Sequence, residues 1–137
     1  MKKLIVLTAF ILIAGIAFAQ TLQKGSLIGI HNTSFSLNPD VELKEFVDFQ
    51  VNKMIPAVEK NFVGVKLFIM KGDRGEEKNG YAFMWYFKSV KERDIYFTAE
   101  GELTEKGSAA QEKLSPLIEE MSKFGSYTTT HTDWVIL

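Results

Sequence analysis

The sequence contains no cysteine, only three prolines, and almost no excess of charge of either sign. Without cysteine, no disulfide can form and no cysteine-linked lipoprotein anchor is expected, so an apolar core must hold the fold together. The net charge of −1 provides no basic face of the kind that nucleic-acid binding requires. We therefore expect no nucleic-acid partner. Apolar residues make up 46% of the 137 residues, which is typical of a globular protein.

The first nineteen residues have the pattern of a cleavable signal peptide. Lys2 and Lys3 precede an apolar run over residues 4–16, and Ala17 and Ala19 occupy the positions that a signal peptidase reads. The run is shorter than the roughly 18–20 residues of a membrane-spanning helix. We predict a signal peptide at 1–19 and a single domain at 20–137. The mature protein would be exported, periplasmic or extracellular, with no membrane segment.

The remainder of the chain alternates between strand and helix patterns. β-branched and aromatic runs bounded by Gly, Pro and Asn predict strands, and apolar residues spaced three or four apart predict helices. Ser89 and Glu92 form a capping box that begins a short helix at Val90. Asn38 or Asp40 is expected to cap the first helix. The predicted elements are strand 26–37, helix 41–60 with a kink or a new segment at Pro56, strand 62–71, a hairpin loop, strand 80–88, the short helix, loop 100–107, helix 108–124 and strand 126–137.

This order, β-α-β-β-α-β, predicts an α+β domain of the ferredoxin-like type. In that arrangement a four-stranded antiparallel sheet carries its two main helices on one face. The third strand nevertheless has apolar residues on both faces, with Phe83 and Trp85 pointing one way and Met84 and Tyr86 the other. Helices can cover only one of these faces. We therefore predict a homodimer whose sheets pair through the other face.

The segment YAFMWYFKS at 81–89, followed by ERDIYF at 92–97, resembles the dimeric α/β-barrel superfamily. The resemblance extends over about residues 26–137. It implies a barrel formed by two sheets, with a ligand cleft between each sheet and its helices. The superfamily includes cofactor-free monooxygenases, haem-degrading enzymes, polyketide cyclases and isomerases. Fold alone does not choose among these activities.

The candidate catalytic residues are His31, His131 and Asp133. The two histidines lie on the first and last strands, which are neighbours in a ferredoxin-like sheet, and His131 and Asp133 share a strand face. Three interpretations remain open: a metal site of two histidines and a carboxylate, an acid/base pair in which Asp133 orients His131, or two unrelated histidines. Phosphate-loop, nucleophile-elbow and H-E-x-x-H motifs are absent from the sequence. We expect neither a cofactor nor a metal.

Four aromatic residues are candidates for a ligand pocket: Tyr81, Trp85, Tyr86 and Trp134. Aromatic walls suit planar hydrophobic ligands, although the same residues could simply pack at the sheet interfaces. The sequence thus favours binding of a small apolar or aromatic molecule. A cofactor-free enzyme of the monooxygenase, cyclase or isomerase type is the first alternative. An interaction protein of the cell envelope is the second.

Overall fold

The computed structural model describes residues 22–137, so the predicted signal peptide lies outside the described residues. Four strands and several helical segments alternate along this part of the chain. They are β1 (Leu27–Leu37), α1 (Leu43–Phe49), the π-helical segment η1 (Gln50–Met54), α2 (Ile55–Asn61), β2 (Lys66–Lys71), β3 (Tyr81–Phe87), α3 (Val90–Arg93), α4 (Glu105–Glu112), α5 (Ser115–Ser122) and β4 (Gly125–Val135).

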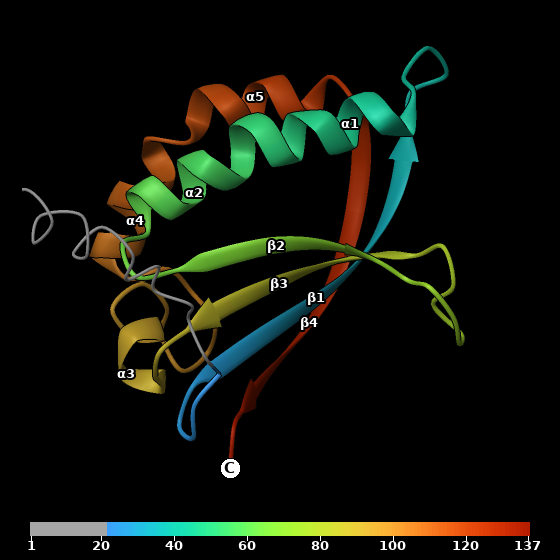
Figure 1. Cartoon of the computed structure of the whole chain (residues 1–137). Helices are drawn as coiled ribbons and strands as arrows, with labels where there is room; N and C mark the ends of the chain where they lie inside the picture. Colours follow the sequence, from blue (N-terminus) through green and yellow to red (C-terminus); the bar gives the residue numbers. More distant parts are fainter. Residues whose placement is uncertain (1–21) are drawn as a thin grey trace, which may run out of the picture.

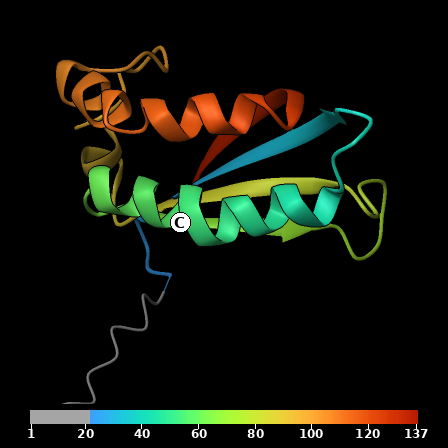
Figure 2. The same cartoon turned by 90° about the horizontal axis from the view of Figure 1, so that it is seen from above.

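The strands form one antiparallel sheet in the order β2-β3-β1-β4. The helices α1, α2 and α5 run above one face of this sheet, as Figure 1 shows from the side and Figure 2 from above. The topology confirms the predicted α+β, ferredoxin-like fold. Within residues 22–137, no helix is long and apolar enough to cross a membrane.

The first helical stretch runs from Leu43 to Asn61 and widens in its middle. The N–H of Ile55 bonds to the carbonyl of Gln50, five residues back, instead of four. This wider turn directly precedes Pro56, whose ring would clash with the carbonyl four residues earlier in a regular α-helix. Pro56 then occupies the first turn of α2, which confirms that it begins a new segment.

The prediction that Asn38 or Asp40 caps the first helix was wrong. Residue Glu42 stands at the N-cap of α1, and its side chain makes no capping hydrogen bond. The amide of Asn38 instead donates to the carbonyl of Lys123, at a distance of 2.9 Å, where α5 ends. Asn38 therefore ties the end of β1 to the start of β4.

The second helical stretch differs from the prediction at both its start and its middle. Helix α4 begins at Glu105, inside the predicted loop, because the hydroxyl of Thr104 accepts a hydrogen bond from the N–H of Gly107 at 3.1 Å. The predicted helix 108–124 is also divided, since α5 starts anew with Pro116 in its first turn. The shorter β2 is a further correction, because Phe62 at the C-cap of α2 and a turn at Gly64 occupy the start of the predicted strand 62–71.

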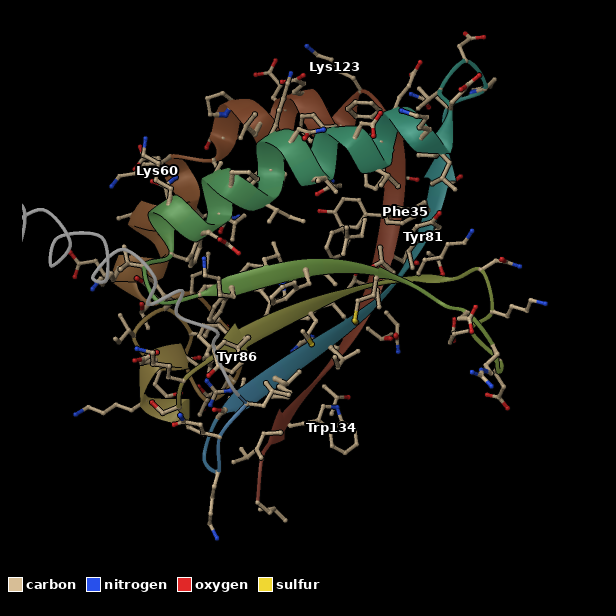
Figure 3. All side chains as sticks on the ribbon, in the orientation of Figure 1. Phe35, Lys60, Tyr81, Tyr86, Lys123 and Trp134 are labelled. Atoms are coloured by element: carbon tan, nitrogen blue, oxygen red, sulfur yellow. The ribbon has the colours of Figure 1, made fainter. Side chains whose placement is uncertain are left out.

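The core lies between the helices and the sheet, and Leu27, Val65, Phe62 and Val58 are among its most deeply buried side chains. The opposite face of the sheet carries no helix (Figure 1). There, Trp134 points away from the helices (Figure 3) and is 59% exposed, and Phe68 is 47% exposed. The protein thus keeps one covered apolar layer and one uncovered apolar face.

Candidate functional site

A cavity of about 760 Å³ lies between the sheet and the helices. Because side chains alternate along a strand, the odd-numbered residues of β1, β3 and β4 face the helices and reach this space. Apolar side chains from α2, β2, α5 and the segment after α3 complete it. The aromatic part of the lining includes Phe62, Trp85 and Phe97. The polar wall includes His31, Thr33, Thr129, His131, Asp133 and Arg93.

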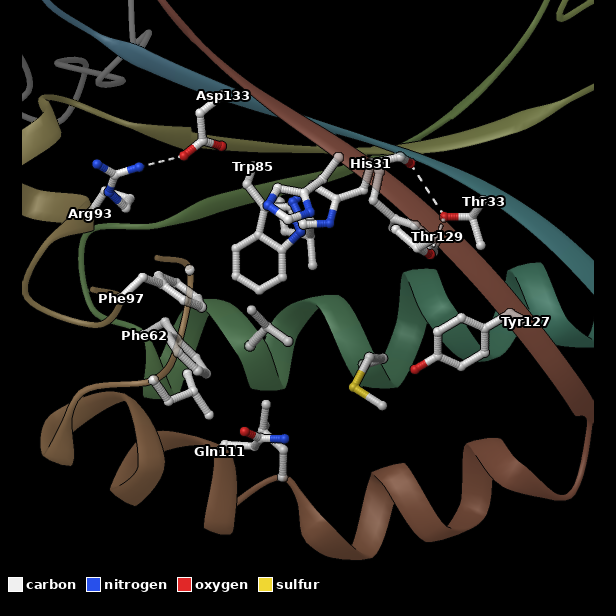
Figure 4. A pocket seen from close by; sticks show the side chains of 18 of the residues that line it. His31, Thr33, Phe62, Trp85, Arg93, Phe97, Gln111, Tyr127, Thr129 and Asp133 are labelled. Carbon is white, nitrogen blue, oxygen red and sulfur yellow. Dashed lines mark hydrogen bonds and ion pairs between the residues drawn. The ribbon is translucent and has the colours of Figure 1, made fainter. Parts of the chain in front are cut away.

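The two histidines lie directly opposite each other on β1 and β4. Their rings are stacked with centroids 5.1 Å apart, and the ring of His31 also lies 5.8 Å from that of Trp85. One step further along the strands, the hydroxyls of Thr33 and Thr129 share a hydrogen bond of 3.1 Å. Figure 4 shows this polar ladder along the sheet side of the cavity. The predicted proximity of His31 and His131 is confirmed.

The pKa of the His31 imidazole is held below its ordinary value. Burial is the largest cause, because it disfavours the charged ring, and repulsion from His131 acts in the same direction. Attraction to Asp133 opposes both effects. At neutral pH, His31 is therefore an uncharged imidazole that can accept a proton or a hydrogen bond from a molecule in the cavity.

The carboxylate of Asp133 is held by an arginine from a different element. The guanidinium of Arg93, at the end of α3, donates to Asp133 Oδ2 at 2.5 Å and to Asp94 Oδ1 at 2.7 Å. Figure 4 shows the first of these pairs at one end of the cavity. The side chain of Arg93 is only 20% exposed, so this pair is better shielded from water than an ordinary surface ion pair. It fixes one oxygen of Asp133 and leaves the other free to turn toward the sheet.

Gly29 provides the space into which that second oxygen turns. It lies opposite Asp133 in the β1–β4 register, in the interior of a strand where glycine is otherwise unfavourable. A Cβ atom added at Gly29 would lie 2.8 Å from Asp133 Oδ1 and 3.5 Å from His31 Nε2. The missing side chain therefore lets the carboxylate and the imidazole approach the same point of the cavity wall.

Aromatic rings form the wall below the histidines. The ring of Phe62 meets that of Trp85 edge-on at 6.0 Å and stacks with that of Phe97 at 6.1 Å. The rings of Trp85 and Phe97 are perpendicular, with centroids 6.3 Å apart. The three side chains come from the end of α2, from β3 and from the segment after α3, and Figure 4 shows them grouped at one end of the cavity. They offer flat apolar surfaces beside the polar wall.

The predicted site residues are divided between the two faces of the sheet. The lining includes His31, Trp85, His131 and Asp133. Tyr81 lies on the same face but packs against Phe35, with ring centroids 6.0 Å apart, and is not part of the lining.

The remaining two predicted residues lie on the other face. The Tyr86 hydroxyl shares a hydrogen bond of 3.3 Å with the Ser26 hydroxyl, and Trp134 is exposed to solvent (Figure 3). The structure therefore brings four of the seven predicted residues together at the cavity.

Arg93 and Gln50 are among the polar lining residues that the sequence alone does not indicate as site residues. Arg93 pairs with Asp133, forty residues later, and no sequence pattern indicates this contact. Gln50 lies within the cavity lining and is 2% exposed, and its amide donates to the sulfur of Met121 at 3.2 Å. A signal for Gln50 did exist, because it stands on an otherwise apolar helix face between Phe46 and Met54.

The histidine cluster does not have the arrangement of a metal centre. Among residues 22–137, no group of three His, Asp or Glu side chains is placed to hold a metal ion. With His31 uncharged and Asp133 bound to Arg93, the arrangement is instead suited to hydrogen bonding and proton transfer.

No family model matches the sequence, and no curated protein matches it. Several solved structures have a similar fold. Two NIPSNAP family proteins from Agrobacterium tumefaciens str. C58 both superimpose with a TM-score of 0.51. One, of unknown function, is 9% identical, over 84% of this chain and 93% of its own. The other is 11% identical, over 80% and 91%.

A third protein, from Bacteroides fragilis NCTC 9343, is described as dimeric, of unknown function and with a ferredoxin-like fold. It is 17% identical with a TM-score of 0.40, over 83% of this chain and 100% of its own. At these identities, the first two likenesses support the fold and carry no information on activity.

Proposed function

We propose that the protein binds a small aromatic molecule in the cavity between the sheet and the helices. The observation that carries this proposal is a largely apolar cavity of about 760 Å³, most of whose polar side chains lie on the sheet wall. Pockets for small molecules typically span about 300–1,000 Å³ and combine apolar walls with a few convergent polar groups. The rings of Phe62, Trp85 and Phe97 would contact the flat faces of the ligand. His31 and Asp133 would bind its polar substituent.

Intrinsic fluorescence offers a direct test, because the chain has two tryptophans on opposite faces of the sheet. Trp85 lies in the cavity and Trp134 lies on the face away from the helices. In the variant Trp134→Phe, only Trp85 reports, and we expect a saturable change of its emission as 2-naphthol or a similar aromatic compound is added.

The matched variant Trp85→Phe keeps the exposed reporter and a ring in the cavity. We expect aromatic compounds to leave its Trp134 emission unchanged while the compound still binds by calorimetry. Emission changes of equal size in both variants would indicate nonspecific contact and would contradict binding in the cavity. The absence of binding by any compound of a broad aromatic panel would contradict the proposal as a whole.

A second candidate function is cofactor-free acid/base catalysis on the bound molecule. It is favoured by the half-buried His31, whose lowered pKa keeps the imidazole ready to accept a proton at neutral pH. In this reaction, a nitrogen of His31 takes a proton from an acidic C–H of the ligand and returns a proton to the same carbon. The measurement is deuterium incorporation into a bound ligand in D₂O, followed by NMR. Exchange that persists unchanged in His31→Gln would contradict a role for this residue.

We also propose that two copies of the chain pair through the uncovered sheet face. Phe68, Met84 and Trp134 lie on this face, and its β4 portion carries Ser and Thr, so the β4 portions of two copies would meet without like charges opposing each other. In light scattering, the wild type is expected to have the mass of a dimer and Met84→Lys that of a monomer. Val63→Lys is the matched control, because Val63 is 73% exposed but lies in the turn before β2. A monomeric wild type would contradict this pairing.

Export remains a further proposal, supported by the pattern of residues 1–19. Expression of the full chain in a bacterial host followed by intact-mass analysis tests it. We expect a mature protein that begins at Gln20 in the exported fraction, whereas the full-length mass in the cytosol would contradict cleavage.

A further inference from the structure

We infer that the cavity selects aromatic molecules that carry a hydrogen-bond donor and no negative charge. This inference rests on the proposed ligand-binding function and adds the chemical class of the ligand. It follows from the charges around the cavity, from one carboxylate oxygen that accepts no hydrogen bond from residues 22–137, and from the aromatic rings of the wall.

The charged side chains of the cavity leave it with an excess of negative charge. Its charged lining within residues 22–137 consists of Arg93, Glu100 and Asp133, and no lysine contributes to it. The single guanidinium already binds two carboxylates, those of Asp94 and Asp133. An anionic ligand would therefore meet two lining carboxylates and a cation whose charge is already compensated.

One oxygen of Asp133 is positioned to accept a hydrogen bond from a ligand. Oδ2 binds Arg93, whereas Oδ1 accepts no hydrogen bond from any residue in the described part of the chain and lies over the bare Cα of Gly29. The carboxylate is partly exposed at 31%, so water satisfies Oδ1 until a ligand displaces it. A hydroxyl or amine of the ligand would donate to this oxygen, whereas a carboxylate would be repelled by it.

The aromatic wall adds to this preference. The faces of Trp85, Phe62 and Phe97 carry the negative part of the ring quadrupole, which attracts cations and the positive edges of other rings. An uncharged aromatic donor or an aromatic ammonium can pack against the rings and also donate a hydrogen bond to Asp133. An aromatic carboxylate of the same shape can pack against the rings but has no hydrogen bond to donate to Asp133.

Three naphthalene compounds of similar size separate the charge of the ligand from its shape. 2-Naphthol, 2-naphthylmethylamine and 2-naphthoate are titrated into the full mature chain by calorimetry at about pH 8, where an ordinary imidazole is neutral. We expect the alcohol and the amine to bind at least about tenfold more tightly than the carboxylate. Equal or tighter binding of 2-naphthoate would overturn the inference and leave the proposed aromatic binding intact. If none of the three binds, the proposed function itself fails.

Two matched variants locate the source of the discrimination. Asp133→Asn removes the carboxylate and frees Arg93 from one of its two partners, so we expect the affinity for 2-naphthoate to rise about tenfold and that for the amine to fall. Asp73→Asn removes the same charge from the exposed loop between β2 and β3, outside the cavity, and is expected to change neither affinity. Identical behaviour of the two variants would show that overall charge, and not Asp133, sets the preference, and would overturn the assignment.

Discussion

The substitution Gly29→Ala should separate the stability of the protein from the function of its cavity. The added Cβ atom would lie 2.8 Å from Asp133 Oδ1, a contact that carbon and oxygen atoms do not sustain. The carboxylate would have to retreat by about half an ångström, and its hydrogen bond to Arg93 would weaken. The other neighbours, His31 Nε2 at 3.5 Å and Trp85 Cβ at 3.6 Å, are at ordinary contact distances.

The energetic consequences for folding nearly cancel. Alanine at a compatible position in a strand stabilises the protein by about 0.4–1 kcal/mol, because the unfolded chain has fewer conformations to lose. Weakening a partly exposed ion pair costs up to about 1 kcal/mol. We therefore expect the free energy of unfolding in urea to change by less than about 1 kcal/mol.

Ligand binding should respond much more strongly. A hydrogen bond to a charged group contributes about 1.5–3 kcal/mol, so displacing Asp133 Oδ1 should weaken 2-naphthol binding by about ten- to a hundredfold. Titration of the Trp85 emission measures this loss, and Ser34→Ala, an exposed change on the other face of β1, serves as the control. Unchanged affinity in Gly29→Ala, or a loss of stability above about 3 kcal/mol, would refute this reasoning.

Three further predictions concern pH and stability. Because the pKa of His31 is lowered mainly by burial, the unfolded chain binds more protons than the folded chain just below the ordinary histidine pKa. The stability contributed by His31 should therefore hold above about pH 6.5 and fall as the pH drops from there through the folded pKa. Urea unfolding at several pH values should show a smaller fall in the free energy of unfolding for His31→Gln than for the wild type. NMR titration should give His31 a pKa below that of an ordinary histidine. Thr104→Ala should lower the free energy of unfolding by about 1 kcal/mol through loss of the α4 cap, whereas Thr104→Ser should restore it. Leu27→Ala, at a residue 1% exposed, should cost about 2–5 kcal/mol, against less than about 0.5 kcal/mol for Leu22→Ala at 54% exposure; equal losses would contradict the assigned core.

The sheet side of the site was predictable from the sequence. The order of strands and helices makes the first and last strands neighbours, and the two-residue period of a strand puts His131 and Asp133 on one face. The structure adds the register, which pairs His31 with His131 and Gly29 with Asp133. Strand order is a property of chain topology, so it can be derived from elements that are located only approximately.

The contacts between helices and sheet could not be predicted in the same way. Arg93 reaches Asp133 only because α3 ends after a single turn, and the position of such a short helix depends on the turns around it. The sequence also shows two apolar faces on β3 without indicating which one the helices cover. Trp85 and Tyr86, on opposite faces of β3, are therefore both candidates for the pocket from the sequence, and the structure places only Trp85 in the cavity.

The π-helical segment corrects the phase of the long helix. Five of its buried residues recur at every fourth position, at Phe46, Gln50, Met54, Val58 and Phe62, and Phe49 is buried beside them. In a regular α-helix this spacing would drift by about 40° per step, and by about 160° from the first of these residues to the last. The wide turn takes up much of the drift, so that one stripe faces the cavity along the whole helix. In a regular α-helix of the same length, Phe46 would point about 160° away from Phe62 and would leave the core. The wide turn therefore determines whether one face of the helix can form the roof of the cavity along its whole length.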